Sequence, residues 1–473
     1  MSPSANQYSP PSAHLIRGLG YWATTAMVVG NIIGTGIFTV PRKMAQDTGA
    51  EGLVYLVWIA GGILSLFGAL SIAELGASIP EAGGSYVYLR RAFGPKWGFL
   101  FGWMNNVVGK PSSIASIASG LLIFVAYILP GAATPLFTLP IQLPLAWHPY
   151  YFTVTLAQPL AAVAILFVTG INYLGVRLAG QVQVLLTSLK VGALVAICLC
   201  GFWLSAGIAD SRPAFPAVFT SALFGGFFTA LAAALWGYDG WIDITLAAGE
   251  VQNPGRNLPR AIIGGTILVA AVYLLANAVY FHVLTLDQVV AARNVASSAV
   301  QAFAGHGVAV WVTLAMIVSA LGTLNSSILT GSRVPYAMAR DGLFFRVADG
   351  IHPRYFTPAG ALLFQGTMAS LMVLTGQFEE LISLFIFAQW IFYALAVASM
   401  MRLRKLEPDL PRPYRTWGYP LVPVVFILGA LALTVSIFVN SPGRSSVGLL
   451  LILSGLFFYQ RWQRASPVPS VRP

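Results

Sequence analysis

The stretch that decides the fold is Gly30-Asn31-Ile32-Ile33-Gly34-Thr35-Gly36-Ile37-Phe38, in the middle of the apolar segment 19–44. That segment is long enough to cross a bilayer, since a membrane-spanning helix needs roughly 20 mostly apolar residues. Three glycines fall within the seven residues 30–36, and each glycine inside a helix costs about 1 kcal/mol relative to alanine. Irregular backbone at membrane depth is tolerated only where it is buried in protein or lines a water-filled cavity. The stretch therefore predicts a helix that is broken for a purpose.

A second interrupted stretch, Leu235-Trp236-Gly237-Tyr238-Asp239-Gly240-Trp241, lies in the sixth apolar segment. Close helix packing through small residues is an alternative explanation for either stretch alone. Interrupted segments at corresponding positions of two halves, however, are typical of inverted-repeat transporters. The two breaks are expected to face each other around a central site. Unwound amides and a half-helix N-terminus suit a carboxylate, and freed carbonyls suit an ammonium, so this site is expected to suit an α-amino acid.

The composition places the chain in lipid. Of its 473 residues 57% are hydrophobic and only 9% are charged, and the mean hydropathy is +0.77. Soluble domains carry about 25% charged residues, so a soluble enzyme is excluded. Cys198 and Cys200, the two cysteines of the chain, lie inside one apolar run. The sequence therefore predicts no disulfide framework, no metal site and no cofactor.

A pass along the chain predicts twelve membrane spans, separated by proline, glycine or charged residues: 19–44, 52–78, 97–129, 152–174, 181–206, 220–248, 258–284, 306–333, 358–376, 379–401, 420–440 and 446–463. The predicted fold class is an all-α polytopic membrane protein with a five-plus-five inverted repeat, discontinuous helices one and six, and two extra helices. The predicted organisation is one transporter domain over 19–463, with repeats over about 19–206 and 220–401, helices eleven and twelve over about 420–463, and tails over 1–18 and 464–473.

The positive charges predict the orientation. Nineteen of the 26 lysines and arginines fall on one side of these spans, five on the other and two within spans. Cytoplasmic loops carry the excess of positive charge, so both termini are expected in the cytoplasm, and the expected membrane is the bacterial cytoplasmic (inner) membrane. The net charge of +11 is then explained without nucleic acid as a partner.

Five charged residues lie within predicted spans, where each costs about 2.5–3.5 kcal/mol at the bilayer centre and is a functional hypothesis: Glu74, Lys110, Lys190, Asp239 and Asp243. Glu74 lies near a helix end, where snorkelling or an ion pair competes with function. Lys110 precedes Pro111, which leaves a structural role at a kink and a pocket-lining role open.

Lys190 and Asp239 each leave two readings open. The Lys190 ammonium, about ten residues into the fifth span, is predicted to brace a broken helix as a bound sodium ion does elsewhere, and proton transfer is the alternative because buried lysines lose protons readily. Asp239 offers its backbone carbonyl to the substrate while its carboxylate caps the next half-helix, or its carboxylate meets the substrate amine directly.

The chain resembles the amino acid-polyamine-organocation (APC) superfamily and, within it, the L-type amino-acid transporters, as a bacterial relative. The residues that carry the resemblance run in the expected order from the first span to the eleventh: 30–38, 78–86 (SIPEAGGSY), 110–113 (KPSS), 248–254 (AGEVQNP), 256–260 (RNLPR), 324–327 (LNSS), 332–333 (SR) and 411–414 (PRPY). The combination is specific, whereas a lone GxG motif is weak.

The resemblance implies alternating access around a midplane amino-acid site. It implies that Gly34, Thr35 and Gly36 meet the substrate carboxylate, and that the carbonyls of Ile32, Trp236 and Asp239 meet its ammonium. Trp236 occupies the position of an aromatic gate. Lys190 matches the lysine that replaces sodium in this branch, with Ser319 as its expected hydroxyl partner, which implies sodium-independent exchange or proton-linked uptake.

The chain departs from the L-type pattern in ways that bear on the substrate. Lys110 stands where arginine is usual, Ile242 where animal members often have a polar residue, and Asp239 where many relatives have glycine. Together with Ile33, Gly109 and Trp236, Ile242 suggests a pocket without fixed charge, which favours neutral amino acids, whereas Asp239 favours a cationic amino acid or polyamine. The external loop at about 130–151 lacks cysteine, so no disulfide-linked heavy chain is expected.

Two other classes of membrane protein are weaker interpretations. A membrane-embedded enzyme would need a motif that the chain lacks, because Tyr238-Asp239 resembles only half of an intramembrane aspartyl protease signature and no HExxH motif is present. A channel would need a ring of acids or a carbonyl filter repeat, and neither is visible. The predicted partners are an amino-acid substrate and the lipid bilayer, with protons as an open alternative for coupling.

Overall fold

The computed structural model describes residues 15–129, 131, 134–141, 150–205, 207, 214–216, 221–292, 294–374 and 378–465. The predicted tails therefore lie outside the described residues over 1–14 and 466–473. The helices of the first half are α1 (Tyr21–Ile32), α2 (Gly36–Thr48), α3 (Glu51–Ser78), α4 (Ser85–Phe93), α5 (Pro95–Met104), α6 (Lys110–Ile128), α7 (Ala157–Tyr173), α8 (Val176–Leu204) and α9 (Ser221–Gly237).

The second half continues with nine more α-helices: α10 (Pro254–Val283), α11 (Leu286–Ala291), α12 (Val295–Ala304), α13 (His306–Gly331), α14 (Arg333–Arg340), α15 (Ala359–Leu374), α16 (Phe378–Leu406), α17 (Leu421–Asn440) and α18 (Pro442–Ala465). The remaining elements are the π-helix η1 (Asn105–Gly109), the 3₁₀ helices η3 (Asp243–Leu246), η4 (Ala248–Glu250) and η5 (Arg346–Asp349), and the strands β1 (Pro135–Ile141) and β2 (Tyr150–Thr155).

Nine helical segments of the described chain are long and apolar enough to cross a membrane: Tyr21–Thr48, Glu51–Ser78, Pro95–Ala126, Val176–Leu204, Pro254–Val283, His306–Arg340, Ile386–Leu406, Leu421–Asn440 and Pro442–Gln463. Each coincides with a predicted span. The other three predicted spans, 152–174, 220–248 and 358–376, coincide with shorter apolar helices, α7, α9 and α15. The chain is thus a multi-pass membrane protein.

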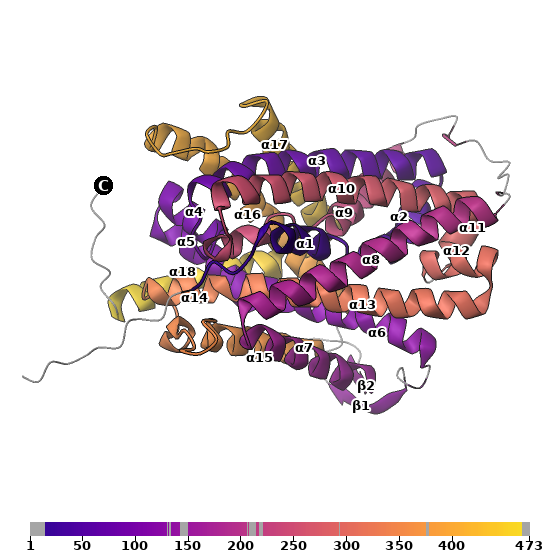
Figure 1. Cartoon of the computed structure of the whole chain (residues 1–473), viewed down its shortest axis with the longest axis horizontal. Helices are drawn as coiled ribbons and strands as arrows, with labels where there is room; N and C mark the ends of the chain where they lie inside the picture. The colour runs from indigo at the N-terminus through magenta and orange to yellow at the C-terminus, as the bar shows by residue number, and fades with distance from the viewer. Residues whose placement is uncertain are drawn as a thin grey trace, which may run out of the picture.

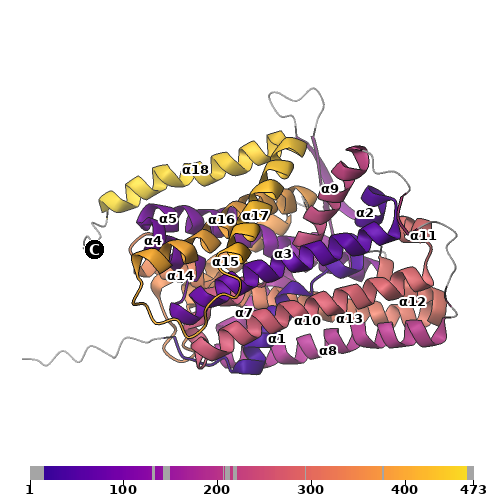
Figure 2. The same ribbon diagram turned by 90° about the horizontal axis from the view of Figure 1, so that it is seen from above.

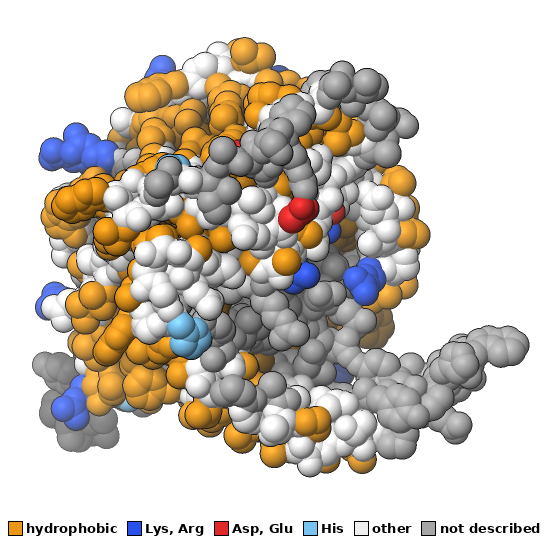
Figure 3. Space-filling view, turned by 90° about the vertical axis from the view of Figure 1, so that its right-hand side faces the viewer, with side chains coloured by type: hydrophobic (Ala, Val, Ile, Leu, Met, Phe, Trp, Pro, Cys, Tyr) orange, Lys and Arg blue, Asp and Glu red, His pale blue; other side chains and the backbone are white. Residues whose placement is uncertain are grey.

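The outer surface of the helix bundle carries many large apolar side chains, as expected of a surface in contact with lipid. Trp203 is 88% exposed, Trp311 73% and Phe167 66%, which would be costly in water for so many large apolar groups. Figure 3 views the bundle from one end, and the side chains around its outer edge are largely hydrophobic, with few charged ones among them. This pattern is the one expected where lipid surrounds the helices.

The broken first span lies at the centre of the bundle. Helix α1 packs against α8, α10 and α13, and in Figure 1 it lies near the middle with these helices around it. Every residue from Ala26 to Ile32 is buried, so other helices enclose this part of α1 on all sides. Helices α17 and α18 lie at the periphery, with α18 along one edge of the bundle (Figure 2). The core position of α1 is what places the break between other helices.

The all-α prediction needs a correction between the third and fourth spans. Strands β1 and β2 form an antiparallel pair, and Thr138 faces Thr153 with their hydroxyl oxygens 3.2 Å apart. Residues 150–155 (YYFTVT) are aromatic or β-branched and so favour extended backbone. Consequently α7 begins at Ala157 rather than near residue 152. Residues 142–149 of the predicted loop 130–151 lie outside the described part.

The third span is continuous in the prediction but carries a π-helical turn in the structure. The turn η1 ends at Gly109, and Pro111 follows at the start of α6. Proline lacks an N–H and its ring crowds the carbonyl four residues earlier, so a wider turn before it relieves the clash. The turn lies where the chain passes from α5 to α6 and positions Lys110.

Two ion pairs tie irregular segments to the helices. Arg333 forms a double hydrogen bond with Glu250, with Nε–Oε1 at 2.6 Å and Nη2–Oε2 at 2.9 Å, and both side chains are almost fully buried. Glu74 accepts from Arg404 at 2.8 and 2.5 Å and from the backbone amide of Thr416 at 2.7 Å. Of the alternatives for Glu74, the ion pair is confirmed. These pairs fix η4 to α14, and α3 to α16.

Candidate functional site

The first break separates α1 from α2 over Ile33–Thr35. The first amides of a helix have no acceptor within the helix, and no side chain caps the N-terminus of α2. Gly36, the first residue of α2, lies so close to the second break that an added Cβ would be 3.1 Å from Cα of Gly237. Glycine is required there to let the two backbones approach. The prediction that the breaks face each other is confirmed.

The second break follows α9, which ends at Gly237, and the chain then turns through residues 238–242 before η3. The expected second half of this span is therefore a short 3₁₀ helix. Tyr273 of α10 joins the two breaks, because its hydroxyl lies 2.9 Å from the carbonyl oxygens of both Ile32 and Gly237. Sequence reasoning missed Tyr273, because the sequence of an apolar helix does not reveal which of its tyrosines will donate to the backbone of a broken helix.

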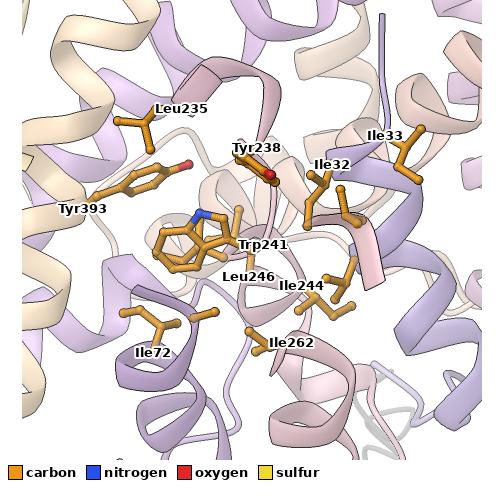
Figure 4. Packing of buried hydrophobic residues seen from close by; sticks show 14 of the residues in the cluster. Ile32, Ile33, Ile72, Leu235, Tyr238, Trp241, Ile244, Leu246, Ile262 and Tyr393 are labelled. Carbon is orange, nitrogen blue, oxygen red and sulfur yellow. The ribbon is translucent and has the colours of Figure 1, made fainter. Parts of the chain in front are cut away.

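Aromatic and aliphatic side chains pack around the second break. Trp241 lies with its ring centroid 5.4 Å from that of Tyr393 of α16, and Tyr238 lies 5.2 Å from Tyr273. Figure 4 shows Trp241 between Tyr393 and Tyr238, with Ile32 pointing toward this cluster and Ile33 pointing away from it. The break is thus held by rings from several helices rather than by regular hydrogen bonds.

A cavity of about 50 Å³ lies between the two breaks. Six predicted substrate-binding residues line it: Ile32, Gly34, Thr35, Gly36, Trp236 and Asp239. The lining residues that sequence reasoning did not assign to the site are Asn31, Ser113, Ser116, Ile117, Gly237, Gly240, Asp243 and Thr323. The serines and Ile117 come from α6, two to six residues after Pro111, and they could have been found only from the way α6 packs beside the two breaks.

Three predicted pocket residues do not line this cavity. Ile33 is fully buried in the core and presents only its carbonyl, to Lys190. Ile242 is also buried, and its carbonyl accepts from Thr245. Gly109 ends the π-helical turn, and a Cβ there would meet Met104 at 3.1 Å. The structure therefore does not bring these three residues to the cavity between the breaks, although each neighbours a lining segment in sequence.

The Asp239 carboxylate lines the cavity and accepts a hydrogen bond from the Tyr393 hydroxyl at 2.5 Å. It does not cap the following half-helix, because η3 has no side-chain cap. Within the described chain no lysine or arginine forms an ion pair with Asp239. A carboxylate in the cavity wall that forms no ion pair within the described chain suits a cationic group of a ligand.

A second carboxylate in the cavity wall, that of Asp243, is already neutralised. It is paired with the ammonium of Lys110 and accepts from the side-chain amide of Asn31. The side chains of Lys110 and Asp243 are 3% and 6% exposed. Of the two alternatives for Lys110, the structural one fits, because Lys110 does not line the cavity. This ion pair joins α6 to η3 across α1.

Lys190 of α8 contacts the end of α1 directly behind the cavity. Its Nζ donates to the carbonyl oxygens of Gly30 at 2.9 Å and of Ile33 at 2.7 Å, and lies 3.1 Å from the Thr323 hydroxyl. The hydroxyl partner is therefore Thr323, one helical turn after the expected Ser319. Ser319 Oγ is buried without a hydrogen-bond partner among the described residues. The helix-crossing geometry, which sequence alone does not supply, selects Thr323.

The close approach of α1 to α8 explains why residue 30, the first of the stretch 30–38, is a glycine. A Cβ on Gly30 would lie 2.0 Å from Nε2 of Gln183 and 2.5 Å from Oγ1 of Thr187. Both of these side chains lie within hydrogen-bond distance of the Ala26 carbonyl oxygen, at 3.3 and 3.0 Å. At Gly30 the close-packing explanation therefore applies, whereas at Gly34 and Gly36 the glycines accompany the break itself.

Comparison with known proteins identifies the family that builds this arrangement. The family model described as "Amino acid permease" matches residues 19–459, which include both breaks and Lys190. The chain belongs to the amino acid permease family of the APC superfamily. Proteins of this family and the relatives described below carry names of transporters, not of enzymes.

The permease is similar to transporters from animals and bacteria over most of its length. It is 34% identical to the b(0,+)-type amino acid transporter 1 of Mus musculus over 94% of this chain and 88% of the relative. It is 31% identical to the serine/threonine exchanger SteT of Bacillus subtilis (strain 168), over 94% and 96%. It is 33% identical to the large neutral amino acids transporter small subunit 2 of Mus musculus, over 94% and 80%.

Proposed function

We propose that this permease carries amino acids across the membrane by alternating access, with the cavity between the two broken helices as its substrate site. The observation that carries the proposal is the chemistry of the two sides of that cavity. One side presents the uncapped N-terminus of α2 at Gly34, Thr35 and Gly36, and the other presents the Asp239 carboxylate. A helix N-terminus favours an anion and a carboxylate favours a cation. An α-amino acid carries both groups on one carbon.

The ammonium of the substrate is expected to lie between carbonyl oxygens and Asp239. The Ile32 carbonyl already lies near the Tyr273 hydroxyl, and the Trp236 carbonyl accepts from the Asp239 amide. Each carbonyl oxygen keeps a second lone pair, so both remain available to an ammonium. The Asp239 carboxylate adds a charged acceptor, and such hydrogen bonds contribute about 1.5–3 kcal/mol.

The arrangement of charged groups in the cavity supports neutral amino acids as substrates. Asp243 is neutralised by Lys110, which leaves the carboxylate of Asp239 to bind a cationic group. The ammonium of a neutral amino acid can pair with Asp239 while its own carboxylate lies at the N-terminus of α2. A cationic amino acid or polyamine is the second candidate, which Asp239 supports if carbonyls alone hold the α-ammonium and the carboxylate holds the side-chain cation.

Purified protein in liposomes tests the function and separates the two candidates. We expect it to exchange a labelled neutral amino acid, and unlabelled neutral amino acids to compete with it better than lysine or arginine does. Absence of exchange for every amino acid, together with conductance or peptide cleavage, would contradict the proposal. Thermal unfolding against all common amino acids identifies the substrate independently, since a ligand that binds the folded state raises its melting temperature.

The variant Asp239→Asn measures what the carboxylate contributes. We expect the half-saturating substrate concentration to rise roughly 10- to 100-fold, because a hydrogen bond to a charged group is replaced by one to a neutral amide. Asp349→Asn, an equal charge change at an exposed residue of η5, serves as the control and should leave uptake unchanged. If Asp239→Asn did not change the apparent affinity, the backbone carbonyls alone would bind the substrate ammonium.

Trp236 is proposed as the gate of this site. A cavity of about 50 Å³ is smaller than the roughly 150 Å³ of a protein cavity that admits benzene, so an amino acid enters only when a neighbour moves. Trp236 is half-buried and lines the cavity, and its large ring can cover a substrate.

The variant Trp236→Ala is expected to weaken apparent substrate affinity at least about tenfold, because the apolar cover of the site is lost. Trp236→Phe keeps part of that cover and should fall between the alanine variant and the wild type. Concentration dependence of uptake in liposomes gives both values. Equal apparent affinity in all three proteins would remove Trp236 from the gate.

Lys190 is proposed to take the place of a bound sodium ion. Its ammonium binds two carbonyl oxygens at the end of α1, as a metal ion would. Transport is then independent of sodium, and either exchange or coupling to protons supplies the driving force. Uptake measured with and without a sodium gradient, and with and without a pH gradient, separates these cases.

The proposed architecture is twelve spans in a five-plus-five inverted repeat over about 19–206 and 220–401, followed by two helices over 420–463. Both termini are proposed to face the cytoplasm of a bacterial cell, from the positive charge of the loops on that side. Because Cys198 and Cys200 both lie in α8, no disulfide to a heavy chain is proposed. Accessibility of single cysteines introduced in each loop tests the orientation.

A further inference from the structure

We propose that a basic cavity at the start of α10 binds the phosphate-bearing headgroup of an anionic phospholipid. The cavity has a volume of about 600 Å³ and is lined by Arg17, Arg256, Arg260 and Tyr414 among others, with no acidic side chain in its wall. It is separate from the substrate cavity, with which it shares no lining residue. Three arginines around one hollow suit a phosphate, because guanidinium groups bind its oxygens with paired hydrogen bonds.

The three arginines carry charge that the described residues leave unbalanced. Arg17, Arg256 and Arg260 are exposed, and within the described chain none of them forms an ion pair. Arg256 and Arg260 are four residues apart on one helix, a spacing at which like charges repel. Glu250 and Glu74 bind Arg333 and Arg404 instead. An anion in the cavity would balance this charge.

The walls of the cavity are held in place by backbone contacts. Leu19, two residues after Arg17, exchanges backbone hydrogen bonds with the segment before α10, donating to Glu250 at 2.9 Å and accepting from Gln252 at 2.8 Å. On the other wall Gly255 lies so close to Pro413 that an added Cβ would be 3.1 Å away. The arginines are therefore presented by a preformed frame, which lowers the entropic cost of binding.

The position of the cavity, close to the end of the lipid-facing apolar surface, favours a lipid over a soluble phosphate. Ile267 and Leu268 of α10 are 50% and 43% exposed, so the lipid-facing apolar surface begins seven residues, or about 10 Å, beyond Arg260. Beside Arg17, Trp22 at the start of α1 is 74% exposed. Exposed tryptophan and arginine at the end of an apolar surface mark the interface where lipid headgroups lie. In Figure 2 the segment that carries Tyr414 lies at the end of the bundle with α4 and α14.

The start of α10 adds a favourable dipole. The helix has 30 residues, begins at Pro254 and has no side-chain cap. Its first turn, with Gly255, forms part of the cavity wall. The positive end of such a helix attracts an anion and its unpaired amides can donate to phosphate oxygens. This contribution supplements the arginines, which supply the charge.

The test titrates the purified full chain with phosphatidylglycerol, phosphatidylcholine or inorganic phosphate, and follows its melting temperature. We expect phosphatidylglycerol to raise the melting temperature saturably, phosphatidylcholine to do so less, and inorganic phosphate at equal concentration to have no effect. In Arg256→Gln/Arg260→Gln the half-saturating concentration of phosphatidylglycerol should rise roughly tenfold or more.

A matched control separates this site from general surface charge. Lys96→Gln/Arg346→Gln removes the same charge at exposed residues outside the cavity and should leave the titration unchanged. Equal weakening in the control, or equal shifts with both lipids, would overturn the proposal, and a saturable shift with inorganic phosphate would assign the cavity to a soluble phosphate instead. If the glutamine variant does not fold, Arg256→Lys/Arg260→Lys keeps the charge but loses the paired donors, and it should show partial weakening.

Discussion

Replacing Lys190 by methionine is expected to reduce amino acid uptake by roughly 100-fold or more. The Lys190 ammonium donates to the carbonyl oxygens of Gly30 and Ile33, which close the end of α1 beside the substrate cavity. Two charge-assisted hydrogen bonds of about 1.5–3 kcal/mol each are lost, and each 1.4 kcal/mol corresponds to a factor of ten. The freed carbonyls would rearrange the break that lines the proposed substrate cavity. Initial rates in liposomes at matched protein content provide the measurement.

Folding is expected to suffer less than uptake in this variant. Within the described chain no acidic side chain contacts Lys190, so its removal also removes a buried charge that is costly to desolvate. The melting temperature should therefore fall little while uptake is lost. Uptake within a factor of two of the wild type would refute the bracing role.

The same experiment distinguishes the two hydroxyls of α13. Thr323→Val replaces the hydroxyl that contacts Lys190 and both carbonyls by a methyl group, and is expected to reduce uptake about tenfold. Ser319→Ala removes a buried hydroxyl that has no partner among the described residues, and is expected to leave uptake nearly unchanged. The reverse order of effects would restore Ser319 as the partner of Lys190.

Replacing Lys110 by methionine is expected to destabilise the protein by about 3–5 kcal/mol, because the buried carboxylate of Asp243 is left without its cation. The side-chain amide of Asn31 would still donate a hydrogen bond to this carboxylate, but it carries no charge. Thermal unfolding of the purified protein, and the yield of monodisperse protein after solubilisation, measure the loss. A melting temperature equal to that of the wild type would show that Asp243 does not depend on Lys110.

The double variant Lys110→Met/Asp243→Asn is the control for this prediction. It removes both charges, so we expect it to recover most of the stability, since no buried charge stays unpaired. Uptake need not recover, because Asp243 also lines the substrate cavity. A double variant as unstable as the single one would mean that Lys110 acts through packing rather than through charge.

The span map could be predicted because lipid constrains sequence strongly. Nine predicted spans coincide with helices long enough to cross a membrane, and apolar runs bounded by charge leave few alternatives. The hairpin of β1 and β2 was missed because its residues are apolar as well as β-branched, so that hydropathy alone merged 152–155 into the fourth span. The π-helical turn before Pro111 was missed because the length of a helix does not reveal its local winding.

The substrate cavity was predicted in part, for a related reason. Residues on the broken segments, such as Thr35 and Asp239, were found because glycines mark the break in the sequence. Ser113, Ser116 and Thr323 come from unbroken helices, where many residues of the same kind are equivalent until the helices are packed. The sequence did not reveal that Ile33 and Ile242 lie away from this cavity, because irregular backbone gives no fixed periodicity from which to assign a face.

By itself the sequence determined that the chain belongs in a membrane. It also located the breaks in the first and sixth predicted spans and the few charged residues within predicted spans. These conclusions follow from local free-energy costs, because a charged side chain is unfavourable in lipid and a glycine is unfavourable inside a helix. Only the tertiary structure decided the partners, giving Thr323 rather than Ser319 to Lys190, Lys110 to Asp243, and Tyr273 to both breaks. Partner choice depends on how helices far apart in the chain cross, and a shift of one helical turn exchanges one candidate for another of the same chemistry.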